Sequence, residues 1–400
     1  MAMTTVLISG ASIAGPTAAY WLACAGFEVT MVERFDELRP GGQSVDVRGA
    51  GREVARRMGV EDAIRAAGTG EKGLRFVDTD GKVKAAFAAS DFADGNGPTA
   101  ELEILRGDLA RIVFDAATDA GAETVFGDTI TDLDDDSTAV HVTFASGATR
   151  SFDHVIIAEG MRSRTRRLVV DDTDAIRSLG MYTSYFTIPR AASDTQWASW
   201  CSFPGSRSAL IRPDTHGTTR AALSFISGEK GLDALDTAGQ KAQLRARYGD
   251  AGWEIPRVLD GMDASTDFYF EGIGQVTLPT WGYGRVVLLG DAAYCASPVS
   301  GMGTNLSLVG AYVLANEMIA GGDAFSRYES ILRPYVAQAQ KLPPGTPRIA
   351  NPKTRLGVRV LNAAAGVAAS KPVQSIASRF SSPPADAIHL PDYPSPVRPG

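Results

Sequence analysis

Cysteine and histidine are scarce in this 400-residue chain, and neither is clustered. The three cysteines, Cys24, Cys201 and Cys295, stand far apart, and the four histidines are scattered. Zinc sites and disulfide frameworks need closely patterned ligands or pairs. We therefore expect no metal site and no disulfides, a composition that fits a reducing compartment.

Long apolar runs and blocks of like charge are also missing. No consecutive apolar run approaches the roughly 20 residues that span a bilayer, and the N-terminus lacks a signal-like segment. The net charge of -7 is moderate, and the longest acidic run is Asp134 to Asp136. We expect a soluble cytoplasmic protein, without stable membrane insertion and without nucleic acid as a partner.

A strand-helix-strand pattern begins the chain. Residues 4–9 (TTVLIS) are typical of a buried strand, residues 14–25 form an Ala-rich helix pattern, and residues 27–33 (FEVTMVE) are a second apolar strand. Such a unit within about thirty residues is characteristic of dinucleotide-binding folds.

The turn after the first strand carries a variant of the dinucleotide-binding fingerprint. Gly10 permits the tight turn, and Gly15 permits close packing of the helix. Ser12 stands where the middle glycine would let the backbone approach a pyrophosphate. The amides of Ile13 and Ala14, at the helix start, would face the phosphates.

Glu33 strengthens this interpretation, because a glycine turn alone also occurs in α/β proteins that bind no nucleotide. It ends the second strand, where a carboxylate accepts both hydroxyls of an adenosine ribose. A carboxylate there disfavours a 2'-phosphate. The residues therefore indicate FAD or NAD rather than NADP at this turn.

The rest of the chain alternates between helix patterns and strand patterns. Helices are predicted over 49–67 and 106–120, with short strands between them and over 124–152, and a buried strand over 154–160. From 176 four strand-like runs with Pro, Gly and Asp turns indicate an antiparallel sheet, followed by a helix over 237–248 and a strand pair over about 266–278. GRVVLLGD (284–291) returns to the buried parallel-strand pattern.

A second glycine turn follows that last strand. Asp291, after Gly290, is placed to hold a polyol such as a ribityl chain. Gly301 and Gly303 leave backbone amides free at the start of the helix expected from about 304, where they stabilise negative charge on a flavin ring. Gly-Asp by itself is an ordinary turn dipeptide, so its setting carries the inference.

These features occur in the order typical of one family. The sequence resembles the class A flavoprotein monooxygenases of the para-hydroxybenzoate hydroxylase type over roughly residues 4–340. The elements that carry the resemblance are Gly10 to Gly15 with Glu33-Arg34, Arg106-Gly-Asp-Leu, the strand and AEG turn at 154–160, and Gly290-Asp291. The segment GGQSVDVRGAG (41–51) and the length are most similar to the flavin-dependent tetracycline hydroxylases and relatives acting on aromatic polyketides.

The resemblance implies an α/β fold in which a Rossmann-like FAD-binding domain is interrupted by an antiparallel-sheet substrate domain and followed by C-terminal helices. We predict the FAD-binding domain over 1–175 and 281–340, and the substrate domain over 176–280. Residues 341–400 would form a helix near 355–369 and a Pro-rich tail, held loosely. A monomer or a weak homodimer is expected.

The resemblance also implies an activity. FAD would be reduced by NADPH or NADH, and a flavin C4a-hydroperoxide would then hydroxylate an aromatic or polyketide-like small molecule with O2. No side chain is assigned as a catalytic acid or base, because the flavin does the chemistry.

Residue by residue, the resemblance places Arg34 beside the adenine and Arg106 at the phosphate or ribityl side. Arg48 either lies near the isoalloxazine or forms a salt bridge. The residues expected against FAD are Gly10, Ser12, Ile13, Ala14, Gly15, Glu33, Arg34, Arg48, Arg106, Gly290, Asp291, Pro298, Gly301, Met302 and Gly303.

A substrate pocket is expected between the flavin and the antiparallel sheet, dry enough to protect the reactive flavin adduct. Its candidate lining residues, chosen by position, are Tyr185, Trp200, Phe225, Pro298 and Met302. Arg212 or Arg220 is available to orient an acidic or enolic oxygen. Each aromatic residue is also consistent with an ordinary core position.

Two features depart from the family pattern. Glu159 stands where the family has Asp, and its extra methylene is expected to weaken a backbone-holding contact. The segment MRSRTRR (161–167) either receives the phosphates of the nicotinamide cofactor or forms a solvated basic turn.

Three other functions remain open from the sequence alone. A flavin halogenase or reductase would keep the cofactor, although GWEIP (252–256) matches the halogenase W-x-I-P element only in part. A passive flavoprotein that binds a small molecule is a further alternative. A plain NAD dehydrogenase would have no use for the second glycine turn.

Overall fold

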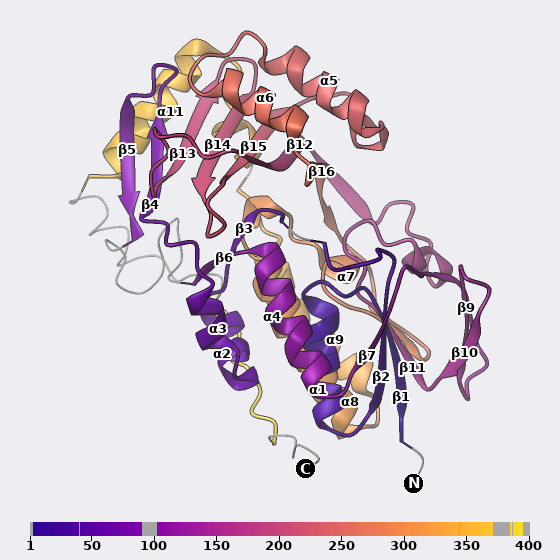
Figure 1. The fold of residues 1–400 in the computed structure, drawn as a ribbon. Coiled ribbons are helices and arrows are strands. Elements are labelled where there is room, and N and C mark those ends of the chain that lie inside the picture. Colours follow the sequence, from indigo (N-terminus) through magenta and orange to yellow (C-terminus); the bar gives the residue numbers. More distant parts are fainter. Residues whose placement is uncertain are drawn as a thin grey trace.

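The computed structural model describes residues 3–39, 41–89, 102–343, 345–370, 385 and 387–394. Figure 1 shows two parts, an upper one built on a broad sheet and a lower one in which helices pack against a second sheet. This mixed α/β architecture confirms the predicted fold class.

The lower sheet has six strands in the order β17-β18-β11-β1-β2-β7. Neighbours from β18 to β7 run parallel, and only β17 is antiparallel to its partner β18. Its strands are β1 (Thr5–Ser9), β2 (Glu28–Glu33), β7 (Glu123–Phe126), β11 (His154–Ile157), β17 (Gly282–Tyr283) and β18 (Val286–Leu288). The predicted strand-helix-strand unit and the return of the chain at 284–291 are thus confirmed.

Helices cover one face of this sheet, and a three-stranded sheet lies on the other side (Figure 1). The buried side chains of these layers form one continuous apolar core. The helices of this part are α1 (Ala14–Cys24), α2 (Gly49–Met58), α3 (Glu61–Ala66), α4 (Arg106–Asp119), α7 (Asp291–Tyr294), α8 (Gly303–Ala320) and α9 (Ala324–Ala339). The small sheet consists of β8 (Ile130–Asp135), β9 (Val140–Phe144) and β10 (Thr149–Phe152).

The upper sheet has seven strands in the order β16-β12-β15-β14-β13-β4-β5. They are β4 (Gly73–Val77), β5 (Val83–Ala88), β12 (Ile176–Ile188), β13 (Ala198–Phe203), β14 (Arg207–Pro213), β15 (Thr219–Ile226) and β16 (Tyr269–Val276). Helices α5 (Thr237–Tyr248) and α6 (Ile255–Ala264) cover its outer face over a second apolar core (Figure 1). A two-stranded sheet of β3 (Ser44–Asp46) and β6 (Glu103–Leu105) lies between the two parts.

The chain returns to the upper sheet after α9. Helix α10 (Thr346–Ala350) is followed by α11 (Arg355–Ala368), which packs beside β5, β4 and β13. Asn351 is buried there, and its Oδ1 accepts a hydrogen bond of 2.7 Å from Ser208 Oγ on β14. The segment after α9 therefore ties the lower part to the upper sheet.

Four details differ from the sequence predictions. The helix predicted over 49–67 is two helices, because Gly59 ends α2 in a left-handed conformation with a φ of 76°. The strand pair predicted over 266–278 is the single strand β16, and α6 was not foreseen. Strands β4 and β5 belong to the upper sheet, so the chain visits it well before residue 176.

The domain boundaries themselves stay a prediction. Most of the predicted Pro-rich tail lies outside the described residues. Within the described part of the chain, no helix combines the length and the apolar character needed to cross a bilayer.

Removing one buried hydroxyl tests how α5 is attached to the upper sheet. Tyr248 Oη donates to the carbonyl oxygens of Ser208 (2.8 Å) and Ser224 (2.5 Å). We predict that Tyr248→Phe lowers the free energy of unfolding by about 1–2 kcal/mol, measured by urea denaturation. Tyr283→Phe, which removes one half-buried hydrogen bond to Thr280, should cost less. An equal effect of the two variants would contradict this account.

Candidate functional site

The carboxyl ends of four parallel strands meet at one edge of the lower sheet. Strands β2, β1, β11 and β18 are neighbours, and they end at Glu33, Ser9, Ile157 and Leu288. Ligands of open α/β sheets bind at this edge, next to the turns that follow the strands. A cavity of ≈ 390 Å³ lies here, lined by residues from all four turns and from α8.

The first turn is packed too closely for side chains. Gly10 has a φ of 107°, and a Cβ there would lie 2.5 Å from Ala158 O. A Cβ at Gly15 would lie 2.0 Å from Gly10 O. Both glycines are therefore required by the contact between β1, α1 and the turn after β11, which leaves the backbone of the turn open toward the cavity.

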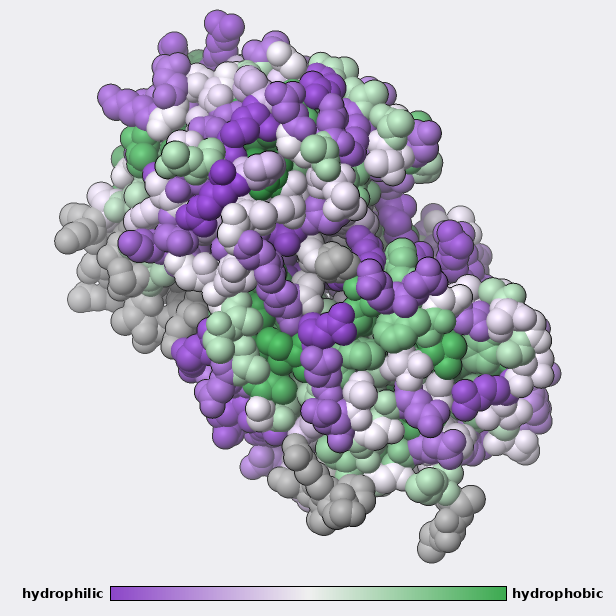
Figure 2. Space-filling view, in the orientation of Figure 1, coloured by the Kyte–Doolittle hydropathy of each residue, from purple (hydrophilic) through white to green (hydrophobic). Residues whose placement is uncertain are grey.

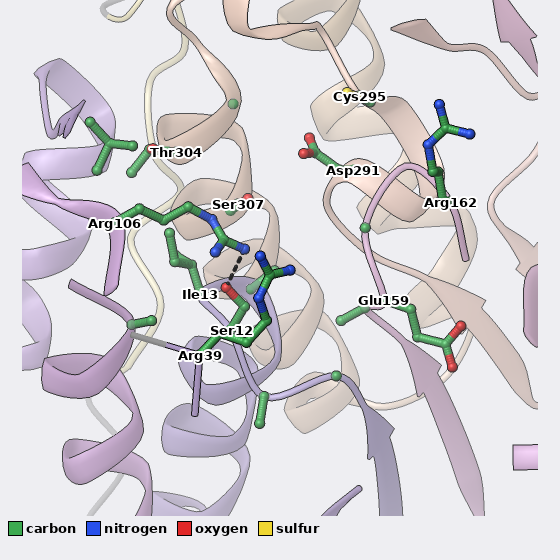
Figure 3. A pocket seen from close by; sticks show the side chains of 18 of the residues that line it. Ser12, Ile13, Arg39, Arg106, Glu159, Arg162, Asp291, Cys295, Thr304 and Ser307 are labelled. Carbon is green, nitrogen blue, oxygen red and sulfur yellow. Dashed lines mark hydrogen bonds between the residues drawn. The ribbon is translucent and has the colours of Figure 1, made fainter. Parts of the chain in front are cut away.

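Arg106 reaches across the cavity to this turn. It is the first residue of α4, and its Nη2 donates to Ser12 Oγ at 2.8 Å, as the dashed line in Figure 3 shows. Both residues line the cavity. A guanidinium beside the free amides of a helix start makes this end of the cavity suited to a phosphate.

Glu33 holds the first turn from the end of β2. Its two carboxylate oxygens accept hydrogen bonds from the amides of Ala11 (3.0 Å) and Phe35 (3.2 Å). The side chain lines the cavity and is only half-buried. It therefore presents an acceptor to a ligand at the same place as it supports the turn.

The second turn touches the first. Gly290 has a φ of 65°, and a Cβ there would lie 3.1 Å from Ala14 Cβ. Asp291 follows as the first residue of α7 and lines the cavity. Burial raises the pKa of its carboxyl above the ordinary range, while a hydrogen bond from Cys295 and the charge of Arg106 lower it. A polar ligand at this place would relieve the cost of burying Asp291.

Glu159 makes more contacts than the sequence suggested. Its carboxylate accepts hydrogen bonds from Ser9 Oγ (2.5 Å), Ser163 Oγ (2.8 Å) and Thr165 Oγ1 (2.5 Å). It also accepts from the amides of Arg164 and Thr165 at 3.1 Å. The expected weakening was wrong, because the longer side chain reaches the backbone of the following turn and still bonds back to β1.

The arginines of residues 161–167 divide into two kinds. Arg166 is fully buried, pairs with Asp172 at 2.8 Å and donates to Ala292 O at 3.0 Å, which ties this segment to the second turn. Arg162 and Arg164 line the cavity. Neither of the two expectations, a phosphate-binding segment or a solvated turn, describes the segment as a whole.

Most of the cofactor residues expected from sequence meet at this cavity. Those that line it are Gly10, Ser12, Ile13, Ala14, Glu33, Arg34, Arg106, Asp291, Pro298, Gly301 and Gly303. Gly15, Gly290 and Met302 lie behind the wall as packing positions. Arg48 forms an ion pair with Asp46 at 2.6 Å, and its amide donates to Asn305 Oδ1 at 3.0 Å.

Sequence reasoning missed several lining residues. Arg39, Ser44, Ser297 and Thr304 line the cavity. Ser297 has a φ of 77°, which is unusual for a residue other than glycine. The available sequence signals were the position of Ser297 next to Pro298 and that of Ser44 within the segment 41–51.

Two hydroxyls test whether the cavity suits a bound group. Ser44 Oγ and Ser297 Oγ are buried and have no hydrogen-bond partner among the described residues. Both residues line the cavity. Because buried polar groups are normally satisfied, these atoms point to a polar ligand. Together with the phosphate-type donors at Ser12 and Arg106, this fits FAD.

Comparison with known proteins decides the family. Residues 3–341 match the family described as the FAD binding domain. The chain belongs to this family. It is 38% identical over 424 residues to the flavin-dependent monooxygenase eupH of Phoma sp, with 98% of each chain covered. The chain is thus a flavin-dependent monooxygenase with FAD as its cofactor, which confirms the family and cofactor expected from the sequence.

Solved structures agree. The tetracycline destructase Tet(51) superposes with a TM-score of 0.79 at 32% identity, covering 98% of this chain and 100% of that one. Klebsiella pneumoniae HpxO, complexed with FAD and uric acid, gives a TM-score of 0.74 at 19% identity, covering 94% and 96%. The second likeness shows the shared fold.

The upper sheet of this monooxygenase has two different faces. Cross-strand partners lie on the same face, and neighbours along a strand alternate. Tyr185, Ala222, Leu210 and Trp200 are successive cross-strand partners and share one face. Because α5 and α6 cover the opposite face, this row faces β6 and the FAD-binding part.

Phe225 lies on the opposite face. Its cross-strand partner is Tyr182, and the two rings stack at 5.5 Å in the second core. Only 1% of Phe225 is exposed. It is the one sequence-predicted substrate residue that the sheet turns away from the FAD-binding part.

Arg212 lies on the face of Tyr185, but acids already bind it. Its guanidinium donates to both oxygens of Glu71 at 3.0 Å and pairs with Glu103 at 2.5 Å. Burial between these like charges raises the pKa of Glu103 to about 8, although Arg212 opposes the shift. Two carboxyls on one arginine therefore hold a proton near neutral pH.

Arg220 is similarly occupied. Its Nη1 pairs with Asp267 at 2.5 Å, and Asp214 lies at 3.5 Å from its Nε. Arg212 and Arg220 are thus both neutralised within the protein.

Removing the Arg106 guanidinium tests the phosphate end of the cavity. We predict that Arg106→Met raises the dissociation constant of FAD about tenfold or more, since a charge-assisted hydrogen bond is lost. Flavin fluorescence titration of the apoprotein measures this. Arg111→Met, on the exposed side of the same helix, is the control and should bind FAD as the wild type does. Equal affinities would contradict the assignment.

The Glu103 pair makes stability depend on pH. Burial raises the pKa of Glu103 in the folded protein to about 8. The stability that its protonated form contributes is therefore fully present below the pKa of the unfolded chain and is lost as the pH rises through about 8. Glu103→Gln mimics the protonated acid and keeps an acceptor for Arg212. We predict that it unfolds like the wild type near pH 5 and is more stable by about 2 kcal/mol near pH 9. A thermal melt series at several pH values checks this, and parallel curves for both proteins would contradict it.

Proposed function

We propose that this monooxygenase hydroxylates a neutral aromatic substrate of the polyketide type, with NADPH or NADH as reductant and O2 as co-substrate. The observation that carries the proposal is the sheet face opposite the FAD-binding part. It offers Tyr185, Leu210 and Trp200 in one row, while Arg212 and Arg220 on this face are already paired.

The cavity residues divide among the parts of FAD. Gly10, Ser12 and Arg106 would hold the pyrophosphate, and Glu33 the adenosine ribose. Asp291 would accept from the ribityl hydroxyls. The turn of Pro298, Gly301 and Gly303 leads into the N-terminus of α8, whose amides favour negative charge on a flavin ring.

Bound FAD supplies the redox chemistry, which takes hydride from the reductant and transfers one oxygen atom from O2 to the substrate. The chain contributes binding, orientation and exclusion of water. The aromatic row would stack against a planar substrate, and Arg212 and Arg220 would not attract a carboxylate there because acids already bind them. No side chain is required as a catalytic acid or base.

The charge balance narrows the substrate class. A carboxylate placed on this face would meet Arg212 and Arg220 only by displacing Glu71, Glu103 or Asp267, each of which is buried or half-buried. Removing one partner of a buried pair is costly. A neutral polyphenol or quinone needs no such exchange, so the expected orienting role of the arginines toward an acidic oxygen is not part of this proposal.

The relatives support the activity. The fungal relative is named a flavin-dependent monooxygenase, and the structural relative Tet(51) is a tetracycline destructase. Both are similar over nearly the whole chain, including the upper sheet.

A paired substrate panel tests the proposal. Purified protein should show flavin bands near ~375 and ~450 nm, and NADPH or NADH oxidation should accelerate with neutral polycyclic phenols. Matched analogues with a carboxylate on the same ring should accelerate it at least about tenfold less. Product mass should increase by one oxygen atom.

Other results would reject parts of the proposal. Stimulation by carboxylates alone would reject the substrate class. Flavin bands with tight phenol binding but no oxidation or product would indicate a passive binder instead.

A further inference from the structure

The most exposed aliphatic side chains of this protein gather in one short stretch. Among the described residues, four of the five most exposed large hydrophobic side chains are Leu356 (70%), Ile349 (64%), Val367 (63%) and Val360 (59%). Single exposed apolar residues are ordinary on a protein surface, and Figure 2 shows them scattered among hydrophilic residues on the upper part. A contiguous group of exposed aliphatics, by contrast, marks an interaction site.

Three of these residues form a stripe along α11. Leu356, Val360 and Val367 are spaced by four and seven residues, which places them on one side of an α-helix. The other side of α11 packs beside β5, and Gly366 allows close approach to the carbonyl of Lys84. The packing therefore fixes which way the stripe points, away from the upper sheet.

The start of the helix is also defined. Thr354 caps α11, with its side chain accepting from the amide of Gly357 at 3.0 Å. The exposed stripe thus belongs to a properly started helix of 14 residues (Arg355–Ala368). Figure 1 shows α11 at the outer edge of the upper sheet, beside β4 and β5 and away from the FAD-binding part.

Charge is strongly one-sided around this stripe. The whole protein has a net charge of -7, yet residues 330–370 contain no Asp or Glu. The basic residues next to the stripe are Arg348, Lys353, Arg355 and Arg359. Within the described part of the chain, none of these four forms an ion pair. Cations without partners beside exposed aliphatics are typical of helices that lie on an anionic lipid surface.

We propose that the outer face of α11 is a docking surface for an anionic bilayer. Leu356, Val360 and Val367 enter the boundary between headgroups and acyl chains. Arg355 and Arg359 extend their stems over the apolar side chains and reach the lipid phosphates. The contact is peripheral and reversible, since the apolar stripe is short and α11 does not cross the bilayer.

A second copy of the chain fits this face less well. A symmetric dimer through α11 would bring Arg355 and Arg359 of two copies together, with no acid in residues 330–370 of either copy, which is repulsive. The charge pattern therefore favours a partner whose surface is uniformly anionic, as a lipid leaflet is.

Vesicle flotation with the FAD-loaded protein tests the proposal. We expect co-flotation with vesicles of phosphatidylcholine and phosphatidylglycerol, little with phosphatidylcholine alone, and release by high salt. Arg355→Gln with Arg359→Gln should weaken binding to the anionic vesicles about tenfold or more. Leu356→Ser with Val360→Ser should abolish co-flotation.

Matched controls separate docking from damage. Leu235→Ser changes an exposed leucine near α5, far along the chain, and should float as the wild type does. All variants should keep the flavin spectrum and the thermal midpoint of the wild type, which shows that they fold.

Three outcomes would overturn the proposal. One is the absence of flotation with anionic vesicles. Another is equal flotation of the wild type and both double variants. The third is a concentration-dependent dimer, seen by light scattering, that the serine variant abolishes while vesicle binding is absent. That result would assign the face to a second copy of the chain.

Discussion

Parallel pairing around β1 is the constraint on which the site depends. Because β1 pairs with β2 on one side and β11 on the other, and β11 with β18, the four carboxyl ends lie at one edge. The turns that follow must then pack against each other. Gly10 against Ala158 and Gly290 against Ala14 leave no room for larger side chains. The open backbone of these turns becomes the wall of the cavity that we propose for FAD.

The same crowding explains the polar groups around the cavity. Glu33 accepts hydrogen bonds from amides of the turn after β1 and of the turn after its own strand, β2, and Glu159 accepts from amides of the turn after β11. Each carboxylate therefore shapes the backbone as well as the surface. Arg166 joins the turn after β11 to that after β18 through Ala292. The cavity is held by several hydrogen bonds between its turns rather than by any single motif.

The upper sheet determines which side chains face the FAD-binding part. Its two faces have opposite roles, one forming a core with α5 and α6 and the other facing the FAD-binding part. Arg212 and Arg220 lie on the side that faces the FAD-binding part, yet both form ion pairs with buried or half-buried acids. Residues that are distant in sequence, such as Glu71 and Glu103, therefore control the electrostatics of the face where we propose that the substrate binds.

Local patterns were sufficient wherever the chemistry is local. The glycine turns, the carboxylate at the end of β2 and the strand-helix alternation all follow from steric and hydrogen-bonding rules within about thirty residues. Together with the family resemblance that they carry, they predicted the fold class, the family and FAD, and 11 of the 15 residues expected against FAD line the cavity. Such rules do not predict which strands pair or which face of a sheet a side chain lies on. From the sequence, Phe225 could lie on either face of β15. In the structure it pairs with Tyr182 of β12 and lies in the core under α5 and α6.

The sequence by itself thus indicated a dinucleotide, FAD or NAD, because turn geometry and the placement of a carboxylate are properties of short segments, and the ordered motifs that resemble the family selected FAD. The tertiary structure decided which side chains remain available to a substrate. Availability depends on long-range partners, namely the acids that occupy Arg212 and Arg220 and the sheet register that selects one face, and no local pattern encodes them.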